Sequence, residues 1–169
     1  MELDKTFLDT SIRTLELLHG RIQSCLDKLD DNRIWLRGSE NENAIGNLVL
    51  HLCGNVRQWI GFGIGGKPDV RMRDREFNAR SDIALNDLKE RLHAAVEDVT
   101  GVLRKVDRDA LSRRVSIQGY DITGLEVIFN CVQHFAQHTG QIIMLTKSFT
   151  HEDLGFYRHL SQPHSEKTP

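Results

Sequence analysis

Apolar residues recur at steps of three and four along four long segments, and this periodicity limits what the chain can fold into. An α-helix turns by about 100° per residue, so such spacing places the apolar side chains on one face. Four helices of this kind bury their faces most readily against one another, which predicts an all-α four-helix bundle. In the first segment, from about Asp4 to Leu29, the apolar positions are Phe7, Leu8, Ile12, Leu15, Leu18, Ile22, Cys25, Leu26 and Leu29.

Capping signals set the expected ends of the later helices. Ser39 with Glu42 fits a capping box for the second helix, and a start at Asn43 is an equally good alternative. This helix is expected to continue through Trp59 and to fray at Gly61, where glycines begin. The third helix is expected from about residue 81 to residue 103. A second capping box, Thr123 with Glu126, predicts a fourth helix that reaches about residue 149.

The connections are of two kinds. Residues 61–80 contain glycines, a proline and many charges, which predicts a long loop. Residues 112–123 alternate apolar and polar side chains before a glycine, which favours a short extended or hairpin-like crossing. We expect residues 1–155 to form a single domain and residues 156–169 to be a partly disordered tail, with Phe156 and Leu160 docked on the bundle.

Composition excludes several classes of function. The chain has 169 residues and a formal net charge of −2, so it lacks the basic character of nucleic-acid-binding proteins. No apolar run approaches the roughly 20 residues of a membrane helix. The three cysteines form no CxxC pair and are odd in number, and the first residues do not resemble a signal peptide. These features predict a cytoplasmic protein with reduced thiols and no membrane or nucleic-acid partner.

Three histidines are the candidate functional residues. His134 and His138 are spaced i, i+4, so they share one face of the fourth helix, and His51 lies beside the apolar face of the second. Neutral imidazole is the commonest metal ligand in proteins, and three imidazoles leave a coordination position open. A single histidine on an apolar face is more often a core residue with a hydrogen-bond partner, so packing is the alternative interpretation.

Two stretches of sequence resemble the DinB/YfiT-like family of metal-dependent four-helix proteins. NAIGNLVLHLCGNVRQWIGF contains His51, and LEVIFNCVQHFAQHTGQIIML contains His134 and His138. The resemblance extends from the first helix to about residue 150. It implies that these three histidines bind a divalent metal, commonly zinc or nickel. It also implies a long crossover between the second and third helices, and a homodimer.

Other residues near the histidines carry weaker hypotheses. Phe135 follows His134, so the H-E-x-x-H pattern of zinc proteases is excluded. Asn55 and Gln141 are candidates for contacts behind the metal ligands, with a polar position at a bundle end as the alternative. Cys131 is a possible ligand, although a small buried apolar role suits it better.

The charged loop supplies further candidates. Asp74 and Glu76 are carboxylates that a loop would bring over the site, or ordinary solvated residues. The cluster Arg71, Arg73, Arg75 and Arg80 would attract an anionic substrate or simply face water. The remaining histidines, His19, His93, His151, His159 and His164, lie on polar faces or in the tail and have no expected role.

Three hypotheses about function follow. The first is an enzyme, a metal-dependent hydrolase or thiol S-transferase that acts on a small molecule. The alternative is a metal- or ligand-binding helical protein without turnover. A plain interaction domain with no metal is a third, simpler possibility.

Overall fold

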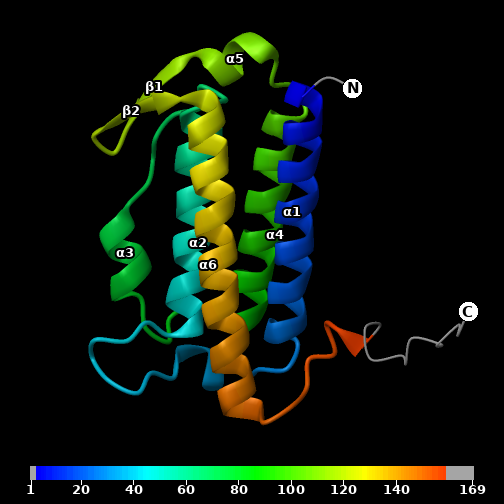
Figure 1. Cartoon of the computed structure of the whole chain (residues 1–169). Helices are drawn as coiled ribbons and strands as arrows, with labels where there is room; N and C mark the ends of the chain where they lie inside the picture. Colours follow the sequence, from blue (N-terminus) through cyan, green and yellow to red (C-terminus); the bar gives the residue numbers. More distant parts are fainter. Residues whose placement is uncertain (1–2, 159–169) are drawn as a thin grey trace, which may run out of the picture.

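The computed structural model describes residues 3–158, and in them four long helices pack side by side with their apolar faces inward (Figure 1). They are α1 (Leu3–Leu26), α2 (Ile45–Val56), α4 (Leu85–Leu103) and α6 (Gly124–Thr150). Their buried apolar residues form one core cluster. The predicted all-α four-helix bundle is therefore confirmed. None of the helices in this part of the chain combines the length and apolar character of a membrane span.

The order of the helices around the bundle explains the long crossover. Helix α1 packs against α4 and α6, and α2 packs against the same two helices. In the view of Figure 1, α1 and α6 run downward and α2 and α4 run upward. Because the consecutive long helices α2 and α4 are parallel neighbours, the chain must return along the full length of the bundle between them. Residues 63–84 make this return, and we call them the crossover.

The crossover is not the structureless loop that its composition predicts. It contains the short helix α3 (Arg73–Asn78), which packs against α2 (Figure 1). Glu76 of α3 is buried, although it lies in a highly charged stretch. A solvated face was therefore the wrong interpretation for this residue.

The ends of α2 differ in detail from the expectation. The helix begins at Ile45, so the Ser39–Glu42 capping box is wrong and the alternative start at Asn43 is close. Ser39 Oγ does donate to Glu42 Oε1 at 3.3 Å, but within the preceding loop, which follows the short helical turn η1 (Arg33–Trp35). Beyond Val56 the chain continues as a π-helical turn, η2 (Arg57–Phe62), and so passes the expected fraying point at Gly61.

A small hairpin leads into the last helix. After α5 (Arg108–Ser112), strands β1 (Arg114–Ile117) and β2 (Tyr120–Thr123) pair antiparallel, which confirms the extended crossing. The turn residues Gln118 and Gly119 have φ values of 49° and 82°, the left-handed region of hairpin turns. Thr123 and Glu126 form the predicted capping box at the start of α6.

The described part of the tail lies on the bundle as expected. Phe156 packs against the core cluster, and the Arg21 guanidinium lies 5.5 Å from the centre of its ring. Leu160 and the rest of the predicted disordered tail lie outside the described residues.

Candidate metal centre

The structure brings the three candidate histidines together between α2 and α6. His51 projects from α2, and His134 and His138 project from successive turns of α6. The Nε2 atoms of His51 and His134 are 2.8 Å apart, and each of the three rings offers a nitrogen within 4.8 Å of the others. Within residues 3–158, this is the one group of histidine, cysteine or acidic side chains with such spacing.

The three imidazole rings stand nearly perpendicular to one another. The angles between ring planes are 74° for His51 and His134, 84° for His51 and His138, and 86° for the α6 pair. Stacked rings would direct their nitrogens in parallel, whereas rings at right angles can direct them toward one point. The orientation therefore suits three donors to a single ion better than packing of flat surfaces.

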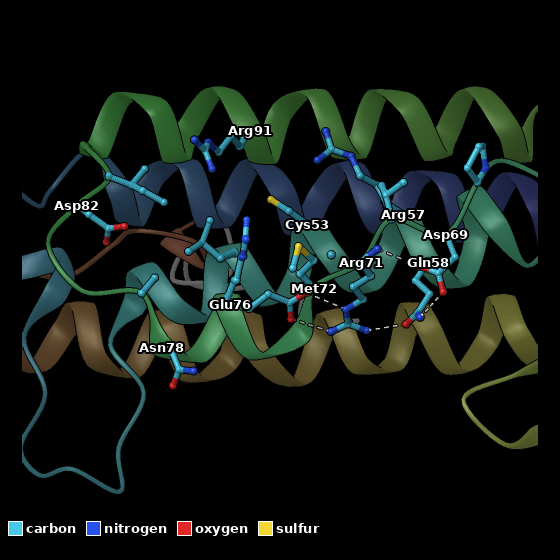
Figure 2. A pocket seen from close by; sticks show the side chains of 17 residues that line it. Cys53, Arg57, Gln58, Asp69, Arg71, Met72, Glu76, Asn78, Asp82 and Arg91 are labelled. Carbon is cyan, nitrogen blue, oxygen red and sulfur yellow. Dashed lines mark hydrogen bonds and ion pairs between the residues drawn. The ribbon is translucent and has the colours of Figure 1, made fainter.

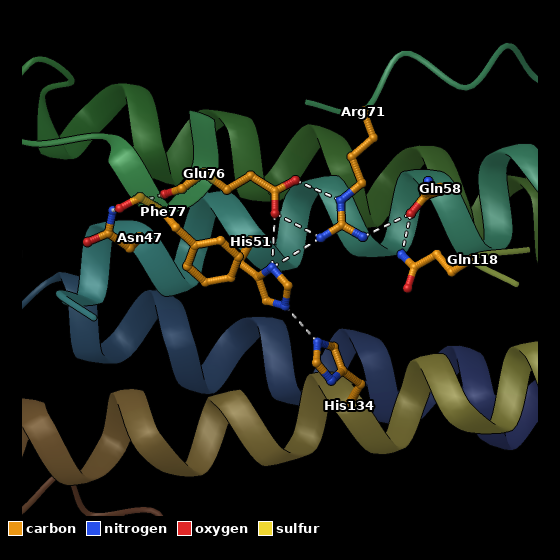
Figure 3. A network of polar contacts seen from close by, with 8 residues as sticks. All are labelled: Asn47, His51, Gln58, Arg71, Glu76, Phe77, Gln118 and His134. Atoms are coloured by element: carbon orange, nitrogen blue, oxygen red, sulfur yellow. Dashed lines mark hydrogen bonds and ion pairs between the residues drawn. The ribbon is translucent and has the colours of Figure 1, made fainter. Parts of the chain in front are cut away.

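His51 is held from behind by a carboxylate of the crossover. Its Nδ1 lies 2.9 Å from Glu76 Oε2, and both side chains are less than a tenth exposed (Figure 3). His51 Nδ1 also lies 3.1 Å from Arg71 Nη2. Glu76 Oε2 is closer and a carboxylate only accepts, so we assign the proton to His51 Nδ1, which donates to Glu76. The lone pair is then on Nε2, which faces His134. Carboxylates commonly orient metal-binding histidines in this way.

Arg71 completes the support of Glu76. Its Nε donates to Glu76 Oε1 at 2.7 Å, and its Nη2 donates to Oε2 at 2.8 Å (Figure 3). This fork neutralises the buried carboxylate in two parallel hydrogen bonds. Arg71 Nη1 also donates to Gln58 Oε1 at 2.9 Å, which fixes the guanidinium against η2.

Asn47, one turn before His51, fastens the end of α3 to α2. Its side-chain amide donates to the carbonyl oxygens of Glu76 at 2.9 Å and Ala79 at 3.0 Å. Its Oδ1 accepts from Arg37 Nη2 at 2.6 Å. The amide is fully buried, so these contacts satisfy groups that water does not reach.

Gly54 leaves the space that Glu76 and Arg71 occupy. A Cβ at this position would overlap Glu76 Oε1 and lie 2.9 Å from its Cδ and 3.1 Å from Arg71 Nε. Gly54 is three residues after His51, on the same side of α2. Glu76 and Arg71 can therefore support His51 only if position 54 has no side chain.

The α6 histidines have less elaborate support. His138 Nδ1 donates to Gln141 Oε1 at 2.6 Å, which leaves Nε2 as its free nitrogen. On the opposite side, the ring of Phe77 lies 4.8 Å from that of His51 and covers it. The hypothesis that Gln141 stands behind a ligand agrees with this geometry.

The environment lowers the pKa of both α6 histidines and keeps their rings neutral. Burial, then the neighbouring rings of His138 and His51 and the charges of Arg71 and Arg73, lower the pKa of His134 to about 4. Burial also lowers the pKa of His138, against an opposing hydrogen bond from Gln141. Burial alone would raise the pKa of Glu76, but hydrogen bonds from Arg71 and His51 outweigh it and lower that pKa. Neutral imidazole and ionised carboxylate are the forms that a metal site requires.

Other candidates from the sequence lie elsewhere or have another role. Cys131 is fully buried, burial raises the pKa of its thiol to about 12, and its Sγ donates to Asn55 Oδ1 at 3.7 Å. The raised pKa keeps Cys131 protonated, so it is not a metal ligand here. Its contact with Asn55 packs α6 against α2. Asp74 is exposed, and Glu126 caps α6. Arg73 lies over the Phe77 ring.

Local sequence patterns do not identify the residues behind His51. Asn47 belongs to no motif, Arg71 is one of several arginines in a charged stretch, and Glu76 has the same sequence context as the exposed Asp74. One local signal indicates α3 itself. Asp74 and Glu76 lie close together in the sequence, and acidic residues are favoured in the first turn of a helix, where the structure places both.

Comparisons with known proteins agree with the fold. A family model described as "Protein of unknown function (DUF1572)" matches residues 2–166. No curated protein matches the chain. A solved structure of a DinB-like protein from Bacillus subtilis has a TM-score of 0.69 and 16% identity, over 88% of this chain and 96% of that chain. A DinB-like protein from Bacillus cereus has a TM-score of 0.68 and 13% identity, over 83% and 91%.

A mycothiol-dependent maleylpyruvate isomerase is also similar. It has a TM-score of 0.64 and 18% identity, over 84% of this chain and 63% of the isomerase. This chain therefore spans less than two thirds of that enzyme. At these identities the similarity establishes the fold, and the resemblance to DinB-like proteins is confirmed.

The lowered histidine pKa values predict how stability depends on pH. The unfolded chain has His134 with a pKa of about 6.5, whereas in the fold the value is about 4. Between these values the unfolded chain binds more protons, so the free energy of unfolding should fall as pH falls from about 7 toward 4. His134→Gln should weaken this dependence. Urea unfolding midpoints of metal-free protein at pH 7.5 and pH 5 measure this dependence. If acidification destabilises the variant as much as the wild type, the lowered pKa of His134 is not its cause.

Proposed function

The chain belongs to the DUF1572 family, a DinB-like family, and we propose that His51, His134 and His138 bind one divalent metal ion. The observation that carries the proposal is the convergence of three imidazole nitrogens from two helices, with His51 oriented from behind by Glu76. Packing alone does not require three polar rings within 4.8 Å of one another between helices. Imidazole donors suit zinc or nickel, the metals that we propose.

The protein groups around the site favour thiol chemistry over hydrolysis. When bound, a divalent ion at three histidines supplies Lewis acidity that favours ionisation of a thiol or water at its open position. Glu76 lies at the far nitrogen of His51 and is occupied by Arg71, so it is not available as a general base. Within residues 3–158, no carboxylate lies close enough to all three rings to share the site with them. A thiol, with a pKa of about 8.5, needs far less help to ionise than water.

We therefore propose a metal-dependent enzyme that transfers a small-molecule thiol, with a metal-binding protein without turnover as the alternative. The fold likeness to a mycothiol-dependent isomerase supports the thiol. In this proposal His51, His134 and His138 hold the ion, Glu76 and Gln141 orient the rings, and Phe77 excludes water from one side of His51.

Metal content tests the ligand set. Protein purified without a histidine tag and supplied with zinc or nickel should hold about one ion per chain by elemental analysis. His138→Ala removes one of three donors and should abolish loading while the helical circular dichroism is retained. His93→Ala, an exposed histidine on α4, is the matched control and should load normally. Absence of metal from the wild type after supplementation would refute the proposal.

Gly54→Ala tests the support of His51 without touching a ligand. The new Cβ should displace the Glu76 carboxylate and release His51 Nδ1. Loss of such a partner typically weakens metal binding about 10- to 100-fold. Gly101→Ala on α4 meets no atom within 4 Å and is the matched control, expected to leave affinity unchanged. Competition with a fluorescent chelator measures both, and equal affinities would show that Glu76 does not act on His51.

Thiol transfer is tested with L-cysteine and monochlorobimane. The cysteine sulfur forms a bond to the bimane carbon, the carbon–chlorine bond breaks, chloride leaves and the thiol proton passes to solvent. Metal-loaded wild type should produce the fluorescent thioether faster than the background, and His138→Ala should not. If other small thiols and electrophiles also give equal rates with loaded and metal-free protein, the non-catalytic alternative is correct.

A further inference from the structure

A cavity lies next to the Arg71–Glu76 pair that supports His51. It has a volume of about 520 Å³ and is lined by residues of α2, η2, the crossover and α4 (Figure 2). None of the three histidines lines it, whereas Arg71 and Glu76 do. Its size is that of a small-molecule site. Part of its wall is apolar and consists of Leu50, Val70, Met72 and Ile83.

Three arginines that line this cavity have no side-chain partner. Arg57 of η2, Arg75 of α3 and Arg91 of α4 are exposed, and within residues 3–158 none of their side chains forms a hydrogen bond, ion pair or ring contact. Every other arginine in that range makes at least one such contact. The unpaired arginines thus gather at one place, from three separate elements.

The acidic residues of the cavity are engaged elsewhere. Glu76 is paired with Arg71. Asp69 accepts from Gln58 Nε2 at 2.8 Å and from the Arg71 backbone at 3.1 Å, and Asp82 accepts from the Arg80 backbone at 3.0 Å. Within residues 3–158, neither Asp69 nor Asp82 forms an ion pair with Arg57, Arg75 or Arg91, and Figure 2 shows Arg91 on α4. The cavity therefore has positive groups that no carboxylate of its own wall neutralises.

We propose that this cavity binds a small molecule with an anionic group and an apolar body. Guanidinium groups bind carboxylates and phosphates through paired hydrogen bonds, and three of them from different elements can surround one such group. The apolar wall would cover the rest of the ligand. This site is distinct from the metal centre, and its ligand binds whether or not the histidines hold metal.

Calorimetric titration with phenyl phosphate tests the proposal. The protein is first freed of metal and dialysed, so that phosphate cannot bind an ion at the histidines. Phenyl phosphate should bind more tightly than inorganic phosphate, which lacks the apolar body, and than benzyl alcohol, which lacks the charge. The double variant Arg57→Gln/Arg91→Gln removes two charge-assisted contacts and should weaken binding about tenfold or more. Arg13→Gln, exposed on α1, should bind like the wild type.

Each alternative result has a definite meaning. Absence of phenyl phosphate binding, or equal affinity for benzyl alcohol, overturns the anion site. Unchanged affinity in the double variant places binding elsewhere and also overturns it. Binding that persists in His138→Ala supports a site separate from the metal centre, whereas its loss there contradicts that separation. Because metal loading is measured independently, failure here leaves the proposed function standing.

Discussion

The carboxylate of Glu76 is the point on which the crossover, α2 and the histidine cluster depend together. It is 7% exposed, and an unpaired charge at that depth would be strongly destabilising. Arg71 neutralises it from the crossover, and His51 donates to it from α2. The burial is therefore tolerable only when both segments are in place, which ties the position of the crossover to the orientation of one histidine.

The sequence was sufficient where local patterns determine structure. Apolar periodicity identified the four long helices, and the Thr123–Glu126 pair identified the start of α6, because a capping box involves only four consecutive residues. His134 and His138 share a face by helical geometry alone. Placing His51 opposite them needed the family resemblance, since nothing local joins residues 83 positions apart.

What the sequence did not reveal depends on contacts between distant residues. Helix α3 has six residues, too few to be stable in isolation, and Asn47 holds its end from 29 to 32 positions away. The charged stretch around Glu76 has the composition of a solvated loop, and only the fold reveals that one of its acids is buried. Likewise, no sequence motif marks Gly54 as a required glycine. Its requirement appears only when a side chain from another element is found in its place.

The Arg71–Glu76 pair belongs both to the cavity and to the support of the histidine cluster. Arg71 and Glu76 form part of the wall of the large cavity and also orient His51. Arg71 donates to Glu76 through both Nε and Nη2, so an anion in the cavity would bind the three unpaired arginines and leave this pair in place. The two sites are therefore distinct in location but share one structural element.

The parallel arrangement of α2 and α4 affects how firmly the histidines can hold an ion. The return segment that it requires also carries the groups behind His51, so the cluster is complete only while that segment is docked. Segments of this type open locally far more often than the long helices unfold. Opening of this segment takes Glu76 away from His51 Nδ1 and frees that ring to reorient, so the affinity of the three histidines for an ion would depend on how firmly the segment is docked.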